Sequence, residues 1–62
     1  MKYAKVRGAI REKFGTQEAF AKAMKMHTST LSSKLRGRTD WTRKEMEDAS
    51  KLLDISVTLF FD

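Results

Sequence analysis

The sequence predicts an all-α fold, a compact bundle of about five short helices. Three observations predict it: apolar residues recur at helical spacing, capping residues and glycines separate the periodic stretches, and the chain has no proline. A chain of 62 residues has room for a single domain, residues 1–62, with one small hydrophobic core.

The first helix is predicted over residues 4–14. Its apolar residues recur every four positions and therefore share one helical face: Val6, Ile10 and Phe14. Gly15 follows, and glycine readily adopts the left-handed conformation that ends a helix. Thr16 is then the predicted N-cap of a second helix, because its hydroxyl can accept a hydrogen bond from the first turn.

The second helix has an apolar stripe formed by Phe20, Ala23 and Met24. A tight turn over residues 25–27 separates it from a third helix over residues 28–36, for which Gly37 is the expected C′ residue. Leu31 and Leu35 lie one turn apart on the apolar side of this third helix. Its other broad face is polar and mostly small: Thr28, Ser29, Ser32, Ser33 and Arg36.

The fourth helix has the clearest start signal in the chain. Thr42 and Glu45 have the spacing of a capping box, and Trp41 and Met46 have the spacing of a hydrophobic staple. Its predicted buried stripe is Met46, Ala49, Leu52 and Leu53. Ser56 is a candidate N-cap for a short fifth element over residues 57–61, for which both a helix and a strand remain open.

The composition excludes several classes of protein. Without cysteine the chain has neither a disulfide framework nor a cysteine-based zinc site, which fits a reducing cytoplasm. No apolar run exceeds three residues, so neither a transmembrane helix nor a signal peptide is expected. His27 is the one histidine and has no partners at catalytic or metal-ligand spacing. We therefore expect no enzyme, no metal and no other cofactor.

The net charge of +5 is unevenly distributed along the chain. Residues 1–38 carry ten basic and two acidic side chains, a net charge of +8, whereas residues 39–62 carry three basic and six acidic ones, a net charge of −3. A strong positive field on a small domain suits a polyanion. The polyanion-binding face is therefore expected within the first two thirds of the chain.

The second and third helices have the layout of a helix-turn-helix. They are short, about four residues join them, and the second of the pair has a small polar face within a basic surface. The major groove of duplex DNA is about 12 Å wide and admits one α-helix. Basic residues beside that helix then hold the phosphates, and the candidates are Lys25, Lys34, Arg36 and Arg38.

The runs TQEAFAKAM (16–24) and STLSSKLRG (29–37) resemble the lambda-repressor-like helix-turn-helix family, which includes the DNA-binding domains of phage Cro proteins and repressors. The resemblance implies that Gln17 contacts a phosphate at the start of the second helix and that Ala21 lies where the two helices cross. It implies core positions at Phe20, Met24, Met26 and Leu31. It also implies base-reading positions at Thr28, Ser29 and Ser33, with Ser32 adjacent.

The sequence departs from the family pattern at three positions. Lys25 stands where the family usually has a glycine in the turn, and a left-handed conformation there costs a non-glycine residue about 1 kcal/mol or more. His27 stands where a serine or threonine would cap the third helix, and Lys34 occupies a position that is often apolar. The reading face also lacks Gln, Asn and Arg, which make bidentate contacts to base edges. We therefore expect phosphates and duplex shape to supply much of the affinity.

The resemblance implies a sequence-specific regulator, most like a phage Cro-type repressor that occupies an operator on double-stranded DNA and blocks transcription without a small-molecule effector. It also implies a twofold homodimer on a pseudo-palindromic site, either preformed or assembled on DNA. The hypothesised dimer contacts are Val57, Leu59, Phe60 and Phe61. One of the two phenylalanines is expected to close the core while the other stays exposed.

Two other functions compete with that of a DNA-binding regulator. The alternative is a small protein-interaction module, an antitoxin or antirepressor, that uses the same fold. A basic amphipathic peptide on an anionic membrane is disfavoured, because Thr16, Gly37 and Thr42 specify a folded bundle. A steep loss of affinity with salt, together with a preference for one duplex sequence, distinguishes a DNA reader from both.

Overall fold

The computed structural model describes residues 3–61 and confirms the all-α class. The elements are α1 (Ala4–Phe14), α2 (Gln17–Ala23), α3 (Thr28–Leu35), α4 (Arg43–Leu53) and the 3-10 helix η1 (Val57–Phe61). The described residues contain no strand, so residues 57–61 form the helical alternative of the two left open by the sequence. Four elements are therefore α-helices, and the fifth is a single stretch of 3-10 helix.

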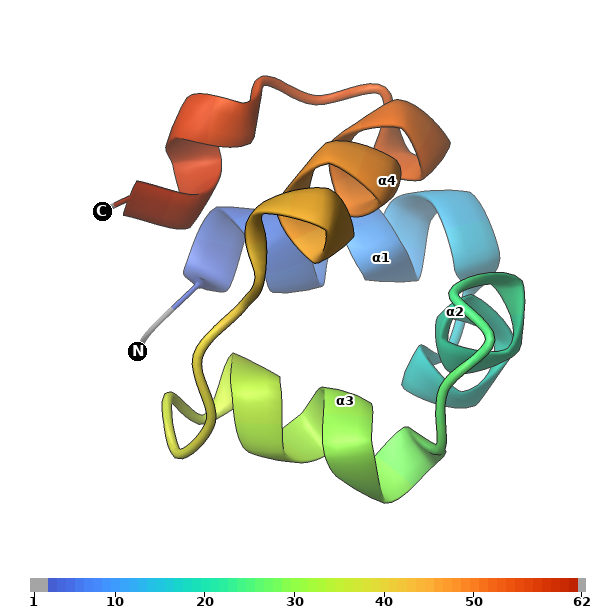
Figure 1. Cartoon of the computed structure of the whole chain (residues 1–62). Coiled ribbons are helices and arrows are strands. Elements are labelled where there is room, and N and C mark those ends of the chain that lie inside the picture. The colour runs from blue at the N-terminus through green and yellow to red at the C-terminus, as the bar shows by residue number, and fades with distance from the viewer. Residues whose placement is uncertain (1–2, 62) are drawn as a thin grey trace.

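The helices enclose one core and give a nearly isotropic molecule, with principal extents of 23 × 23 × 23 Å. In Figure 1, α1 and α4 cross in the upper half, α2 stands at one side, and α3 runs along the bottom. α2 packs on both α1 and α3, while α4 and η1 pack on α1 and on each other. This arrangement leaves one long side of α3 facing solvent.

The predicted helix boundaries are set by the predicted capping residues. Gly15 ends α1 at φ 84°, and its N–H donates to the carbonyls of Ile10 (3.2 Å) and Arg11 (3.0 Å). The Thr16 hydroxyl accepts a hydrogen bond from the Ala19 N–H at 3.1 Å, which confirms Thr16 as the N-cap of α2. Local sequence chemistry therefore determines where both helices end and begin.

The starts of α4 and η1 are also set by capping residues that the sequence predicts. Thr42 and Glu45 form the complete capping box, with bonds of 3.1 Å and 2.9 Å between side chains and backbone N–H groups. The Ser56 hydroxyl accepts a hydrogen bond from the Thr58 N–H at 3.3 Å, in the first turn of η1. Asp54 closes α4 in the left-handed conformation at φ 55°.

The core takes residues from all five elements and from the segment before α4. Phe20, Leu31, Leu35, Val6 and Ala49 are fully buried. The buried cluster is completed by Ile10, Ala21, Trp41, Leu53 and Phe60. Trp41 and Phe60 make an edge-to-face pair with their ring centroids 4.9 Å apart.

Two members of the predicted apolar stripes lie outside this core. Ala23 is exposed at the end of α2, where Ala21 is buried instead. Leu52 is 40% exposed, while Leu53 beside it is buried. The prediction of both as buried residues was wrong, because α2 packs on α1 and α3 while α4 packs on α1 and η1, and neither packing covers these two side chains. Within residues 3–61, no helix has the length and apolar character needed to cross a membrane.

Candidate nucleic-acid interface

α3 is held by its apolar side and presents its polar side to solvent. Leu31 and Leu35 are fully buried against α2 and the core. Thr28 and Ser29 are exposed at the start of the helix, and Ser32 and Ser33 are half-buried one turn later. The four predicted base-reading side chains therefore lie together on one accessible helical face.

The C-terminal end of α3 carries two exposed arginines in a defined backbone turn. Gly37 adopts φ 81°, its N–H donates to the Lys34 carbonyl (3.1 Å), and the Arg38 N–H donates to the Ser33 carbonyl (3.0 Å). These two bonds form a Schellman motif and confirm Gly37 as the C′ residue. Arg36 and Arg38 flank Gly37 and are both exposed, and cations at a helix C-terminus are electrostatically favourable.

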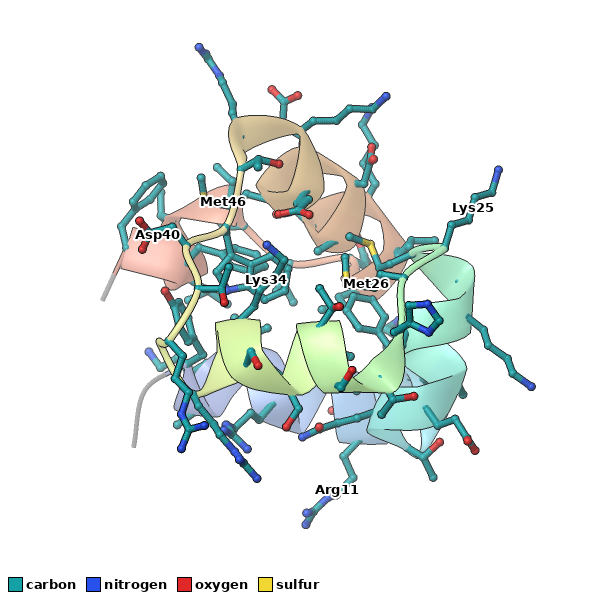
Figure 2. The ribbon with its side chains drawn as sticks, turned by 60° about the horizontal axis from the view of Figure 1, so that its bottom comes forward. Arg11, Lys25, Met26, Lys34, Asp40 and Met46 are labelled. Carbon is teal, nitrogen blue, oxygen red and sulfur yellow. The ribbon has the colours of Figure 1, made fainter. Side chains whose placement is uncertain are left out.

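The turn between α2 and α3 repeats this motif with a lysine in place of glycine. Lys25 has φ 59°, its N–H donates to the Lys22 carbonyl (3.0 Å), and the Met26 N–H donates to the Ala21 carbonyl (3.0 Å). The left-handed conformation costs a side-chain-bearing residue about 1–2 kcal/mol. Lys25 is exposed, and Figure 2 shows its side chain extending away from the protein.

Gln17 lies half-buried in the first turn of α2, next to two arginines of α1. Arg7, Arg11 and Gln17 line one surface depression of about 480 Å³ between α1 and the start of α2. Arg11 points into solvent (Figure 2). The predicted phosphate contact at Gln17 thus has basic neighbours that the helix-turn-helix pattern did not single out.

Arg7 has a positioning role that sequence reasoning missed. Its Nη2 donates to the Leu35 carbonyl across 28 residues at 3.2 Å. That carbonyl belongs to the last residue of α3, where backbone acceptors have no partner within the helix. The bond therefore ties the end of α3 to α1. No local sequence pattern indicates this partner, because it lies 28 residues away in the chain.

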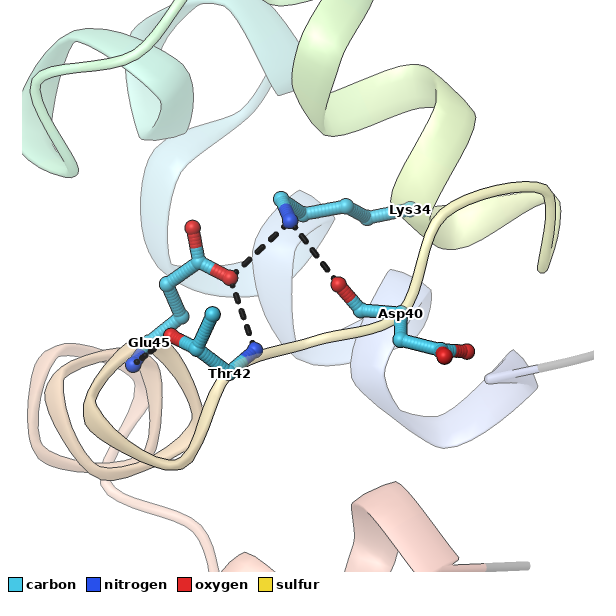
Figure 3. A network of polar contacts seen from close by, with 4 residues as sticks. All are labelled: Lys34, Asp40, Thr42 and Glu45. Atoms are coloured by element: carbon cyan, nitrogen blue, oxygen red, sulfur yellow. Dashed lines mark hydrogen bonds and ion pairs between the residues drawn. The ribbon is translucent and has the colours of Figure 1, made fainter.

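The structure contradicts the predicted phosphate contact at Lys34. This side chain is buried, and it points from α3 toward α4 instead of toward solvent (Figure 2). Its Nζ donates to the Asp40 carbonyl at 2.9 Å and lies 3.0 Å from Oε1 of Glu45 (Figure 3). A buried ammonium ion needs a counterion and hydrogen-bond acceptors, and both are supplied from within the protein. The usable cations around α3 are therefore Lys25, Arg36 and Arg38.

Glu45 connects this ion pair to the capping box of α4. Its Oε1 accepts from the Thr42 N–H as well as facing Lys34 (Figure 3). Burial alone raises the pKa of the Glu45 carboxyl, but the hydrogen bonds from Thr42 and Lys34 and the charge of Lys34 outweigh it and lower the pKa below its usual value of 4.5. The charged form of Glu45 is therefore stabilised by folding.

This lowered pKa predicts a loss of stability in acid. A carboxylate whose pKa is lower in the folded state stabilises the fold above the unfolded-state pKa, and that contribution disappears as the pH falls through the folded-state pKa. As the pH falls from about 6 to about 3, the urea concentration at the midpoint of unfolding is expected to fall more for the natural chain than for Glu45→Gln. Parallel curves for the two proteins would contradict this role of Glu45.

The predicted dimer contacts divide between core and surface. Phe60 is 5% exposed and packs against Trp41 and Tyr3, with ring centroids at 4.9 Å and 6.3 Å. Its prediction as a dimer contact is therefore wrong, because it closes the core of its own chain. Phe61 is 67% exposed and Val57 is 37% exposed. Leu59 is half-buried against the core, so Val57 and Phe61 are the apolar side chains left uncovered on η1.

The comparisons with known proteins give a family without an assigned activity. A family model described as "Protein of unknown function (DUF739)" matches residues 1–62. No curated protein matches the chain. Within residues 3–61 there is also no group of three His, Asp or Glu side chains that could hold a metal ion. Because the family model covers the whole sequence, the chain belongs to the DUF739 family.

Proposed function

We propose that this protein is a sequence-specific, double-stranded-DNA-binding transcriptional regulator that inserts α3 into the major groove. The observation that carries the proposal is the solvent-facing side of α3. It combines small hydroxyl side chains, led by Thr28 and Ser29, with exposed cations at both ends of the helix, Lys25 before it and Arg36 and Arg38 after it. Small polar side chains can reach base edges while the flanking cations contact phosphates.

The interior of the protein supports the same use of α3. A reading helix must keep one orientation, and α3 is anchored by buried Leu31 and Leu35 and by the bond from Arg7 to its last carbonyl. The buried pair of Lys34 and Glu45 adds a link to α4. Thr28 and Ser29 at the start of this face are exposed to solvent, so they are accessible to a ligand.

The experiment is a selection of duplexes from random sequence, followed by fluorescence anisotropy on the selected site and on a random duplex. We expect one enriched half-site and a preference for it over random DNA. With three cations of one subunit on phosphates, the logarithm of affinity should fall with the logarithm of salt with a slope of about −3 per subunit. Binding that shows no sequence preference and no salt dependence would favour the protein-interaction module instead.

Charge-removing variants locate the phosphate contacts. Arg36→Ala is expected to weaken binding to selected and random duplexes by a similar factor and to reduce the salt slope by about one. Lys51→Ala is the matched control, because it removes an equal, exposed charge from the last turn of α4. If Lys51→Ala matched the effect of Arg36→Ala, the affinity would come from net charge and not from the α3 face.

Hydroxyl-removing variants test the reading face. Thr28→Ala and Ser33→Ala each remove the capacity for a single hydrogen bond, worth about 0.5–1.5 kcal/mol. We expect them to reduce the preference for the selected site while leaving the salt slope unchanged. If either variant abolished specific binding while Arg36→Ala had no effect, phosphates and duplex shape would not be the main source of affinity.

The proposed function is that of a Cro-like repressor, which includes repression of transcription and dimeric binding to an operator. The protein acts as a repressor in the cytoplasm of a bacterial host, and it binds a pseudo-palindromic operator as a twofold dimer. The uncovered side chains of η1, Val57 and Phe61, supply the apolar surface for a second copy. Two half-sites spaced by about one helical turn of DNA in the selected duplexes are the expected sign of this dimer.

A further inference from the structure

A second concave surface lies between α2 and α4, and Lys25 is the one lining residue that the DNA-binding proposal also uses. The α2–α4 groove has a volume of about 490 Å³. It is defined by Met24, Lys25, Lys44, Asp48, Lys51 and Leu52. α2 packs on α1 and α3, while α4 packs on α1 and η1, so the side chains of α2 and α4 that face one another line an open groove.

The floor of the α2–α4 groove is apolar. Met24 is half-buried, and Leu52 is 40% exposed. Both belong to the apolar stripes that the sequence predicts for their helices, yet the core covers neither of them completely. Apolar surface of this kind, surrounded by charged side chains, is typical of a binding site for another protein.

The rim of the α2–α4 groove is basic. Lys44, Asp48 and Lys51 follow one another at the i, i+4 and i+7 positions of α4, and Lys25 lines the groove from the turn after α2. Among residues 3–61, no ion pair within 4.0 Å joins these groups; the ion pairs of α4 are Lys34–Glu45 and Arg43–Glu47. The rim therefore carries three lysines against one aspartate, and two of these lysines lie on α4, which belongs to the acidic part of the chain.

Two of the three lysines occupy positions that cost stability. Lys25 has the left-handed φ of 59°, which a glycine would adopt with less strain. Lys44 lies in the first turn of α4, where the helix dipole disfavours a cation. Backbone strain at the surface position Lys25 points to a functional demand there, and both lysines add a positive charge to the groove.

We propose that the α2–α4 groove docks an acidic amphipathic helix of a partner protein. The apolar residues of that helix cover Met24 and Leu52, and its carboxylates face Lys25, Lys44 and Lys51. This is the helix-in-groove mode of recognition. A DNA backbone matches the lysines as well, but it has no apolar group to cover Leu52, so an amphipathic helix fits the groove better.

The test uses the intact protein, labelled with ¹⁵N, and a synthetic peptide of 14 residues. The peptide carries leucine at positions i, i+3, i+4 and i+7 and glutamate on both sides of that stripe. A scrambled peptide of identical composition is the control for charge alone. We expect the amphipathic peptide to shift the backbone signals of residues 23–25 and 44–52, and to bind at least about tenfold more tightly than the scrambled peptide.

Variants assign the binding energy to the groove. Lys44→Glu/Lys51→Glu turns two attractive contacts into repulsive ones and is expected to weaken peptide binding by about tenfold or more. Arg43→Glu is the control matched in charge to each single substitution, Lys44→Glu or Lys51→Glu, because its side chain is 92% exposed on the same helix and does not line the groove. Lys25→Gly is expected to raise the thermal midpoint while weakening peptide binding by about twofold to fivefold, a combination that a merely structural lysine would not show.

Three results would overturn the proposal. The first is the absence of any peptide-induced shift up to millimolar concentration. The second is equal binding of the amphipathic and scrambled peptides, or equal effects of the groove and control variants, since each would reduce the interaction to net charge. The third is a duplex that shifts the signals of Lys44 and Lys51 while the peptide does not, which would assign the groove to nucleic acid. None of these readouts depends on whether α3 reads DNA.

Discussion

Phe60→Ala is expected to unfold most of the protein at 25 °C. Phe60 is 5% exposed and packs edge to face on Trp41, and truncating a buried phenylalanine costs about 3–5 kcal/mol. A single core in a domain of this size supplies about 3–5 kcal/mol in total. Circular dichroism at 222 nm and a urea titration are the measurements. A variant that stays folded with an unchanged midpoint would contradict the assignment of Phe60 to the core.

Phe61→Ala is the matched control for this prediction. Its side chain is the next in sequence, is chemically identical to that of Phe60, and is 67% exposed. Substitutions at exposed positions usually change stability by less than about 0.5 kcal/mol, so the urea midpoint should hardly move. Sedimentation of Phe61→Ala with and without operator then reports on the proposed dimer. Undiminished dimerisation in both conditions would remove Phe61 from the interface.

Glu45→Ala is expected to destabilise the fold by about 2–4 kcal/mol. Removing one partner of a fully buried ion pair costs about 3–5 kcal/mol, and loss of the capping contact adds about 1 kcal/mol. The total is reduced here because the Glu45 side chain is 26% exposed, so that water can reach the orphaned Lys34. Lys34→Met is expected to cost less, because the Glu45 carboxylate that it leaves without a counterion is 26% exposed and still accepts the hydrogen bond from the Thr42 N–H.

A double-mutant cycle separates the ion pair from the helix cap. In the Lys34→Met background no ammonium ion is left unpaired, so Glu45→Ala should cost only the capping contribution of about 1 kcal/mol. Additive effects of the two substitutions would contradict the pair. Lys34→Met also tests the corrected phosphate assignment: the salt slope of duplex binding should stay unchanged, whereas a phosphate-binding lysine would lower it by about one.

Much of the fold is predictable because its signals are local. A capping threonine or a glycine at the helix end acts on backbone groups within a few residues, so the C-terminal ends of α1 and α3, the start of α2 and the box at Thr42 follow from neighbouring residues alone. The same is true of the polar face of α3, which depends only on helical periodicity. η1 could not be assigned, because five residues are too few to distinguish a helix from a strand.

The candidate site was predictable only in part, and Lys34 shows why. Its position in a basic run suggests a solvent-facing phosphate ligand. In the fold, however, the Asp40 carbonyl and the Glu45 carboxylate both lie within 3.0 Å of its ammonium group. Among residues 3–61, no ion pair involves Arg36 or Arg38, and both side chains are exposed. The sequence therefore gives the number of basic residues but does not show which of them form ion pairs within the fold.

By itself, the sequence determined the all-α class, the helix ends and the polar face of α3, since each depends on contacts within one or two helical turns. Only the tertiary structure decided which of Phe60 and Phe61 is buried. It also decided which groups Lys34 and Arg7 bind, and it placed Met24 and Leu52 in the lining of one groove. These outcomes depend on residues far apart in the chain. Burial and ion pairing are properties of the packed neighbours, and packing becomes defined only when all five elements close on one core.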